Sequence, residues 1–283
     1  MKFFLKHFLL LLVVSYLSQL AVFMISKAVL DRYSQFRLTR FYRNPKHSNF
    51  ILGNSRAVNS VNEKYANEKL HVDVINLGFN GMPYSSLKPI LDDVNKLNRN
   101  VTIYVEISAL VNNVFDDSYA YYISNSPELK KEYKSTPFNW LQLLRLNNEI
   151  FLRNIYYLRK SDNDWINNYS ISKALIEQIK NDKRAIVTFP NEEELMARIV
   201  QIQRLCEAHQ NKVIFFLAPY YPDYLKQMAD YKRVTDHLLS RKDIVYYDLN
   251  TLPLPPNSFA DRLHTNVSGA TALTDFLLKT IKE

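Results

Sequence analysis

Five short apolar runs, separated by stretches of helical periodicity, organise the chain after residue 48. They read NFILG at 49–53, VDVINLG at 72–78, VTIYVEIS at 101–108, KVIFFLA at 212–218 and IVYYDL at 244–249. Each run is rich in β-branched and aromatic residues and is bounded by polar or turn residues, as buried strands are. Their near-continuous apolarity, without strict alternation, is typical of a parallel sheet covered on both faces.

Helical patterns fill the intervals between these runs. Apolar residues recur at helical spacing in 87–98, 192–210 and 268–282, and Pro190 and Asn191 provide a start signal for the second pattern. Strands that alternate with helices predict a doubly wound α/β fold. We therefore expect a flavodoxin-like three-layer sandwich with a five-stranded parallel sheet.

The stretch from about 109 to 190 breaks this alternation. It is rich in Tyr, Asn and Leu, contains no clear strand, and has its best helical pattern at 138–158. We interpret it as a mostly helical insertion after the third strand. Such an insertion either caps a substrate cleft or only packs against the body, and the sequence leaves both alternatives open.

The first thirty residues contain a long apolar segment. No charge occurs from Phe8 to Ser26, and a helix of that length spans about 28 Å, close to the roughly 30 Å of a bilayer's hydrocarbon core. The alternative is a cleaved signal peptide, whose apolar core is usually about 7–15 residues long. Ser26-Lys27-Ala28 matches a cleavage site poorly. We therefore expect an uncleaved anchor at 1–30, a linker at 31–47 and a body at 48–283.

The net charge of +8 is concentrated just after this segment. The basic residues there are Lys27, Arg32, Arg37, Arg40, Arg43 and Lys46. This placement favours lipid headgroups, and the absence of a dense Lys/Arg run argues against nucleic acid as a partner. Taken alone, the excess of positive charge after the segment would put the body in the cytoplasm.

The chemistry-bearing residues exclude several classes of protein. A single cysteine, Cys206, allows no intrachain disulfide and no cysteine-based metal cage. No His/Asp/Glu cluster has metal-ligand spacing, and no Gly-x-Gly-x-x-Gly follows the first strand. We therefore expect neither a metal nor a dinucleotide, and no cofactor of any kind.

The four glycines, Gly53, Gly78, Gly81 and Gly269, mark a candidate site. A glycine-poor chain keeps them where the backbone needs positive φ or close approach. Gly53 and Gly78 fall at the ends of the first two strands, and Gly81 follows three residues later. Ligands of open α/β sheets bind outside the carboxyl ends of the strands. Three of the four glycines therefore line one rim.

Ser55, in the stretch ILGNSR, stands just past the first predicted strand and near the start of the next helix. A serine there is exposed to the helix dipole, which favours developing negative charge. The alternative is a simple helix cap, because serine is a preferred N-cap residue.

Asp261 and His264 lie three positions apart in FADRLHTNVSGA, a polar loop before the C-terminal helical pattern. In such a loop the carboxylate can hold the imidazole's tautomer while the other ring nitrogen faces a hydroxyl. The alternatives are a surface histidine and a turn-forming aspartate. The other histidines lie in the apolar segment, near strand starts or in helical patterns.

These blocks together resemble the SGNH hydrolases, also called GDSL-like lipases and acylhydrolases. LGNSR, INLGFNGMP and DRLHTNVSGA resemble the family's serine, glycine and Asp-x-x-His blocks, over roughly residues 48–110 and 210–283. The resemblance implies Ser55 as nucleophile, His264 as general base and acid, and Asp261 as its orienting partner. It also implies that the backbone N–H groups of Ser55 and Gly81 form part of an oxyanion hole.

One block departs from the family, which usually has Gly-x-Asn-Asp after the third strand. Here the chain reads VEISALVNNVFDD, and Leu110 falls about where the asparagine is expected. Asn112 or Asn113 from a shifted loop, or Asn80 from the glycine block, are the candidate substitutes. Arg56, beside the nucleophile, is a candidate contact for an anionic substrate, or else a solvated arginine at a helix start.

Membrane-anchored members of this family, including relatives of those that modify alginate and teichoic acid, act on envelope polymers outside the membrane. The resemblance therefore implies an acyl esterase or O-acyltransferase acting on an envelope or exported polysaccharide. The domain would lie on the periplasmic side of a cytoplasmic membrane that the chain crosses once. A membrane acyl-donor protein is an expected partner.

Two alternatives stay open at this point. Loss of one oxyanion donor lowers a rate by on the order of 10²–10³, so an inactive SGNH-like domain that binds polymer or scaffolds an envelope complex is one of them. A lipid esterase, supplied with substrate by the bilayer, is the other.

Overall fold

The computed structural model describes residues 2–111, 126–129, 158, 166–182 and 184–279. The chain divides into two compact units. One comprises residues 1–44 and 116–162, and the other comprises residues 45–115 and 163–283. The five strands that the structure describes all belong to the second unit.

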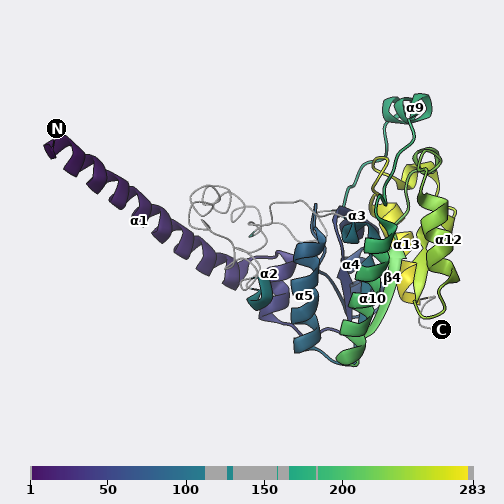
Figure 1. The fold of residues 1–283 in the computed structure, drawn as a ribbon, viewed down its shortest axis with the longest axis horizontal. Coiled ribbons are helices and arrows are strands. Elements are labelled where there is room, and N and C mark those ends of the chain that lie inside the picture. Colours follow the sequence, from purple (N-terminus) through teal and green to yellow (C-terminus); the bar gives the residue numbers. More distant parts are fainter. Residues whose placement is uncertain (1, 112–125, 130–157, 159–165, 183, 280–283) are drawn as a thin grey trace. The chain divides into compact units, whose positions relative to one another are not determined.

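The second unit is built on a five-stranded sheet in which every neighbouring pair of strands is parallel (Figure 1). Its order is β2-β1-β3-β4-β5. The strands are β1 (Asn49–Leu52), β2 (Val74–Asn76), β3 (Thr102–Glu106), β4 (Lys212–Leu217) and β5 (Tyr246–Asp248). Each lies within one of the five apolar runs, so the predicted α/β class with a five-stranded parallel sheet is confirmed.

Helices connect the strands, and two groups of them pack together. α5 packs on α10, and α13 packs on both α3 and α4 (Figure 1). The helices are α3 (Ser55–Ser60), α4 (Glu63–Lys69), α5 (Tyr84–Leu97), α9 (Lys173–Asn181), α10 (Glu192–Ala208), α11 (Pro222–Leu225), α12 (Tyr231–Ser240) and α13 (Val267–Lys279). Short 3-10 turns occupy Ile107–Leu110, Leu249–Thr251 and Pro256–Ser258.

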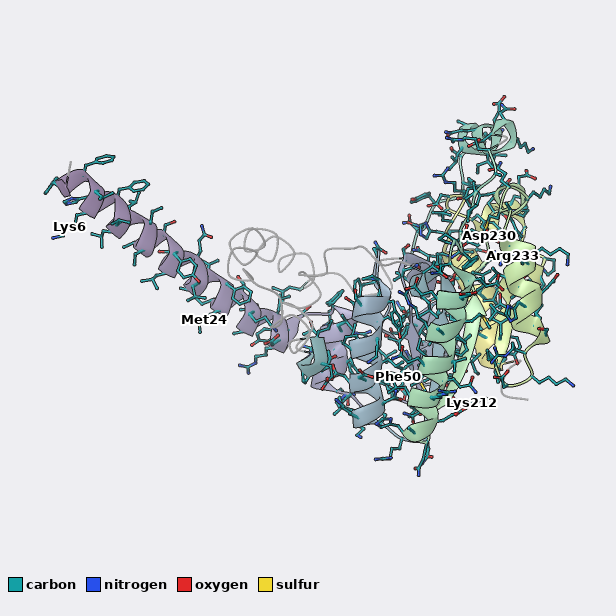
Figure 2. The ribbon with its side chains drawn as sticks, in the orientation of Figure 1. Lys6, Met24, Phe50, Lys212, Asp230 and Arg233 are labelled. Atoms are coloured by element: carbon teal, nitrogen blue, oxygen red, sulfur yellow. The ribbon has the colours of Figure 1, made fainter. Side chains whose placement is uncertain are left out.

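Side chains from both faces of the sheet are buried. Ile51 and Phe216 belong to a buried cluster that includes Leu273 of α13. Phe50, labelled in Figure 2, and Phe215 precede them in the strands and have no exposed surface. Successive strand residues point to opposite faces, so the sheet is covered on both sides, as its continuous apolar runs require.

The first unit begins with α1 (Lys2–Tyr33), which is long and apolar enough to cross a membrane. Its best stretch has a mean hydropathy of 2.4, and side chains such as Met24 project away from the helix (Figure 2). α2 (Arg37–Arg43) follows. Arg43 donates hydrogen bonds of 2.5 Å to the carbonyls of Arg32 and Ser34 and so ties the two helices together. The stretch 31–47, expected as a linker, is therefore helical in part.

Part of the predicted insertion has a described structure. The helix expected at 138–158 lies outside the described residues apart from Leu158. The segment 166–171 and the helix α9 belong to the unit that holds the sheet.

Candidate active site

Ser55 is the first residue of α3, two residues beyond the glycine that follows β1. Asn54 caps this helix, because its Oδ1 accepts a hydrogen bond from the Arg56 N–H at 2.9 Å. The Asn54 Nδ2 group donates to Ser108 Oγ at 3.0 Å, which ties the cap to the turn after β3. The cap is thus Asn54, and the Ser55 hydroxyl is left to make other contacts.

His264 connects Ser55 to Asp261 through both nitrogens of its ring. Its Nε2 lies 2.8 Å from Ser55 Oγ, and its Nδ1 lies 2.9 Å from Asp261 Oδ2. With Nδ1–H donating to the carboxylate, Nε2 accepts the serine hydroxyl proton. The structure therefore brings together the three residues proposed from the sequence, with geometry that suits proton transfer from serine to histidine.

The Asp261 carboxylate is held in place by its own loop. Its Oδ1 accepts hydrogen bonds from the backbone N–H groups of Leu263, at 2.6 Å, and His264, at 2.9 Å. Burial disfavours the charged carboxylate, but the hydrogen bonds and the charge of His264 outweigh it, so the pKa of Asp261 lies below its ordinary value of 3.8. The group that orients the imidazole is therefore ionised at neutral pH.

The Asp-x-x-His loop is also hydrogen-bonded to the C-terminal part of α3. Thr265 Oγ1 donates to the carbonyl of Asn59, and Asn59 Nδ2 in turn donates to the carbonyl of Ser55 at 2.8 Å. A Cβ at Gly269 would lie 2.4 Å from the Ser258 carbonyl oxygen, so only glycine permits this close approach. These contacts fix the histidine loop relative to the serine.

The segment 166–171 borders the same loop. The Val267 N–H donates to the Asn167 carbonyl at 2.9 Å, and the Ile171 N–H donates to the Phe259 carbonyl at 2.7 Å. Asn167 N–H also donates to the Asn59 side chain at 3.1 Å. This part of the predicted insertion therefore contacts both the serine helix and the histidine loop.

The glycine block lies beside the serine block. The Phe79 N–H donates to the Gly53 carbonyl at 3.2 Å, and Gly81 has φ +73°, a conformation that glycine adopts without strain. Among the described residues, no acceptor is found for the backbone N–H of Ser55 or Gly81. Their proposed role as oxyanion donors stays a prediction. Asn80 is exposed in the turn before Gly81.

The third block contributes no side-chain amide at the expected position. Leu110 is fully buried, and its carbonyl accepts a hydrogen bond from Arg198. Asn112 and Asn113, the proposed substitutes, lie outside the described residues. Asn80 stays a candidate third donor, because it is exposed next to Gly81.

The Arg56 side chain is buried among groups of the protein. Its side chain is only 5% exposed, and its guanidinium contacts Glu106, the carbonyls of Leu263 and Ala218, and the face of Tyr220. The interpretation of Arg56 as a contact for an anionic substrate is therefore replaced by a role inside the protein. The reason is local: the residue after a helix's first position points back into the sheet rim here, not out to solvent.

Sequence reasoning missed Glu106 and Tyr220. Glu106 has no exposed surface and accepts hydrogen bonds from the N–H and the hydroxyl of Ser108, at 3.1 and 2.5 Å. A lone carboxylate inside the apolar run VTIYVEIS was the available signal, because a buried charge requires a partner. Tyr220 carried no such signal, since burial of a tyrosine after a strand is common.

Three further findings are negative. No group of three or more potential metal-ligating His, Cys, Asp or Glu side chains occurs in the part of the chain that the structure describes. Comparison with models of known protein families gives no match for this chain. Comparison with curated proteins likewise gives none.

Proposed function

We propose that this chain is a membrane-anchored serine acyl esterase or O-acyltransferase of the SGNH type. The observation that carries the proposal is the continuous hydrogen-bonded path from Ser55 Oγ through His264 to Asp261, at 2.8 and 2.9 Å. The strand order β2-β1-β3-β4-β5 supports the flavodoxin-like layering expected for that family. The insertion after β3 is part of the same proposal.

In the first half of the reaction, Ser55 forms an acyl-enzyme. His264 Nε2 takes the hydroxyl proton as Ser55 Oγ attacks the ester carbonyl, and the ionised Asp261 stabilises the resulting imidazolium. The tetrahedral oxyanion accepts hydrogen bonds from the N–H groups of Ser55 and Gly81. His264 then gives its proton to the departing alcohol as the carbon–oxygen bond breaks.

In the second half, a hydroxyl group removes the acyl group. Water or a sugar hydroxyl attacks the acyl carbonyl, His264 takes its proton, and Ser55 leaves with that proton. The choice between esterase and transferase depends on which hydroxyl reaches the acyl-enzyme. Asn80, exposed beside Gly81, is the candidate third donor to the oxyanion in either half.

The proposed substrate is an envelope or exported polysaccharide that carries acyl esters. α1, with its capacity to cross a bilayer, supports a site held at the membrane surface. A periplasmic position for the domain, and a membrane protein as acyl donor, are parts of the same proposal.

The test uses full-length chain in detergent, as wild type and Ser55→Ala, against three substrates. These are p-nitrophenyl acetate, an O-acetylated polysaccharide and phospholipid vesicles, with a sugar oligomer as acceptor in a parallel reaction. We expect Ser55-dependent release or transfer of acetyl groups from the first two. Loss of Ser55 should lower the rate by about 10⁴-fold or more.

Each other outcome has a distinct meaning. Hydrolysis of phospholipid in preference to polysaccharide would replace the proposal with a lipid esterase. Equal rates for wild type and Ser55→Ala on every substrate would overturn acyl transfer and favour an inactive binding or scaffolding domain.

A further inference from the structure

A buried arginine follows the proposed nucleophile, and its guanidinium joins three segments of the site. Arg56 Nη1 donates to the Leu263 carbonyl at 3.0 Å, and Nη2 donates to the Ala218 carbonyl beyond β4. Its Nε lies 3.4 Å from Glu106 Oε1 at the end of β3. Its planar group stacks 3.4 Å from the centre of the Tyr220 ring. Three of the five guanidinium N–H groups thus have acceptors inside the protein, and the side chain is only 5% exposed.

The hydrogen bond from Arg56 to the Leu263 carbonyl links the guanidinium to the Asp261 carboxylate through one peptide group. The peptide group between Leu263 and His264 accepts the Arg56 hydrogen bond at its C=O and donates its N–H to Asp261 Oδ1 at 2.9 Å. A cation at the carbonyl end of a peptide strengthens the hydrogen bond at the N–H end, because linked hydrogen bonds polarise one another. Arg56 thus acts on the peptide that holds the Asp261 carboxylate against His264.

We infer that Arg56 is a positioning residue for acyl transfer, which fixes the Asp261–His264 pair relative to the Ser55 beside it in sequence. The inference rests on the proposed function and names a determinant of its rate that the family resemblance does not supply. Glu106 is the partner that makes a buried cation tolerable at this place, and Tyr220 provides the flat surface on which the guanidinium lies.

A purely structural role predicts a different result on substitution. A buried ion pair can often be replaced by uncharged groups of similar volume without loss of stability, whereas removal of one partner alone is strongly destabilising. Arg56→Met leaves Glu106 buried without its cation. The double variant Arg56→Met/Glu106→Gln removes both charges and keeps a side chain that can accept the hydrogen bonds from Ser108. This pair of variants separates stability from positioning.

The experiment compares full-length wild type, Arg56→Met, Glu106→Gln and the double variant in detergent. Melting temperature, kcat and KM for p-nitrophenyl acetate are measured for each. We expect Arg56→Met to melt lower than wild type and the double variant to recover most of that loss. We expect kcat of the double variant to stay about 10²-fold low, with KM within about twofold of wild type. Recovery of both melting temperature and kcat would overturn the inference.

A second readout does not depend on turnover. Nitrogen-15 NMR of labelled histidines, assigned with a His264→Gln variant, gives the tautomer of His264. Asp261 on its own loop, Glu106 from β3, Arg56 from α3 and Tyr220 after β4 are the titratable or charged groups of this network. We expect the double variant to lose the single tautomer, because the Nδ1–H of the neutral imidazole loses its aligned carboxylate.

An unchanged His264 spectrum in the double variant would contradict the inference, whatever the activity. Absence of any Ser55-dependent turnover in wild type would instead contradict the proposed function, and the spectrum would still decide the role of Arg56.

Discussion

At the scale of single residues, the site depends on three side chains that the fold brings together from the two ends of the body. Ser55 and His264 are 209 positions apart and lie 2.8 Å from each other, Oγ to Nε2. Asp261 is fixed by two backbone N–H groups before it meets His264. The three side chains are already aligned, so the proposed reaction requires little side-chain ordering.

The lowered pKa of Asp261 makes a prediction about stability and pH. A carboxyl whose folded pKa lies below its unfolded value of 3.8 stabilises the fold above that value. This contribution is lost as the pH falls through the folded pKa. Asp261→Asn resembles the protonated state, so the excess melting temperature of wild type over the variant should be full above about pH 4 and should shrink as the pH falls through the lower, folded pKa. Melting temperatures of both proteins between about pH 2.5 and 7 check this.

The matched control is Asp243→Asn. The Asp243 pKa is also lowered, to about 2, by hydrogen bonds from Arg241 at an exposed position, where screening by solvent reduces the effect on stability. A difference for Asp261→Asn that is flat across the pH range would contradict the account of that carboxylate.

At the scale of elements, the site lies at the carboxyl ends of β1, β3 and β4. Ser55 follows β1, Glu106 ends β3, and Ala218 follows β4. α3 has only six residues, so its first turn depends on its cap and on neighbours more than on helix propensity.

The Asn54 cap makes a prediction about this element. Asn54→Ala removes the acceptor for the Arg56 N–H and the donor to Ser108, and N-cap loss typically destabilises by about 1 kcal/mol. We expect a lower melting temperature and a lower kcat, because Ser55 begins the same helix. Asn54→Asp keeps the capping oxygen and loses only the donor to Ser108. It should therefore recover most of the melting temperature; equal losses in both variants would show that the cap is not the cause.

The strands and part of the candidate site can be predicted from the sequence, for physical reasons. The five strands have buried side chains on both faces, and such strands can be recognised in the sequence as unbroken apolar runs. The grouping of Asp261 and His264 with Ser55 can be predicted because each lies in a short polar motif that is recognisable locally. The role of Arg56 cannot be predicted from the sequence, because its four contacts come from segments far apart in the chain and no sequence spacing indicates them.

At the scale of the whole molecule, the chain consists of two units, one of which begins with the apolar helix α1. The basic residues after this helix and the proposed acyl chemistry argue for opposite sides of the membrane. Large domains can cross a membrane regardless of the charge of the flanking segment. We therefore keep the extracytoplasmic position as the proposal and subject it to a direct test.

The membrane side of the body can be tested by labelling an introduced cysteine, because the chain has a single native cysteine. Cys206 is fully buried, and burial raises the pKa of its thiol to about 12, so it reacts poorly with maleimides. Lys232 on α12 has a side chain that is 83% exposed. We expect a membrane-impermeant maleimide to label Lys232→Cys in intact spheroplasts and to leave wild type unlabelled. Labelling of the variant only after lysis would place the body in the cytoplasm.

The most direct test of the central claim is covalent labelling of full-length protein by a fluorophosphonate, with the modified residue located by mass spectrometry. This reagent reacts with a serine whose hydroxyl is activated by a neighbouring base. The account predicts a phosphonyl group on Ser55 in wild type and none in Ser55→Ala or His264→Ala. An unlabelled Ser55 in folded wild-type protein, or equal labelling of wild type and His264→Ala at Ser55, would contradict it.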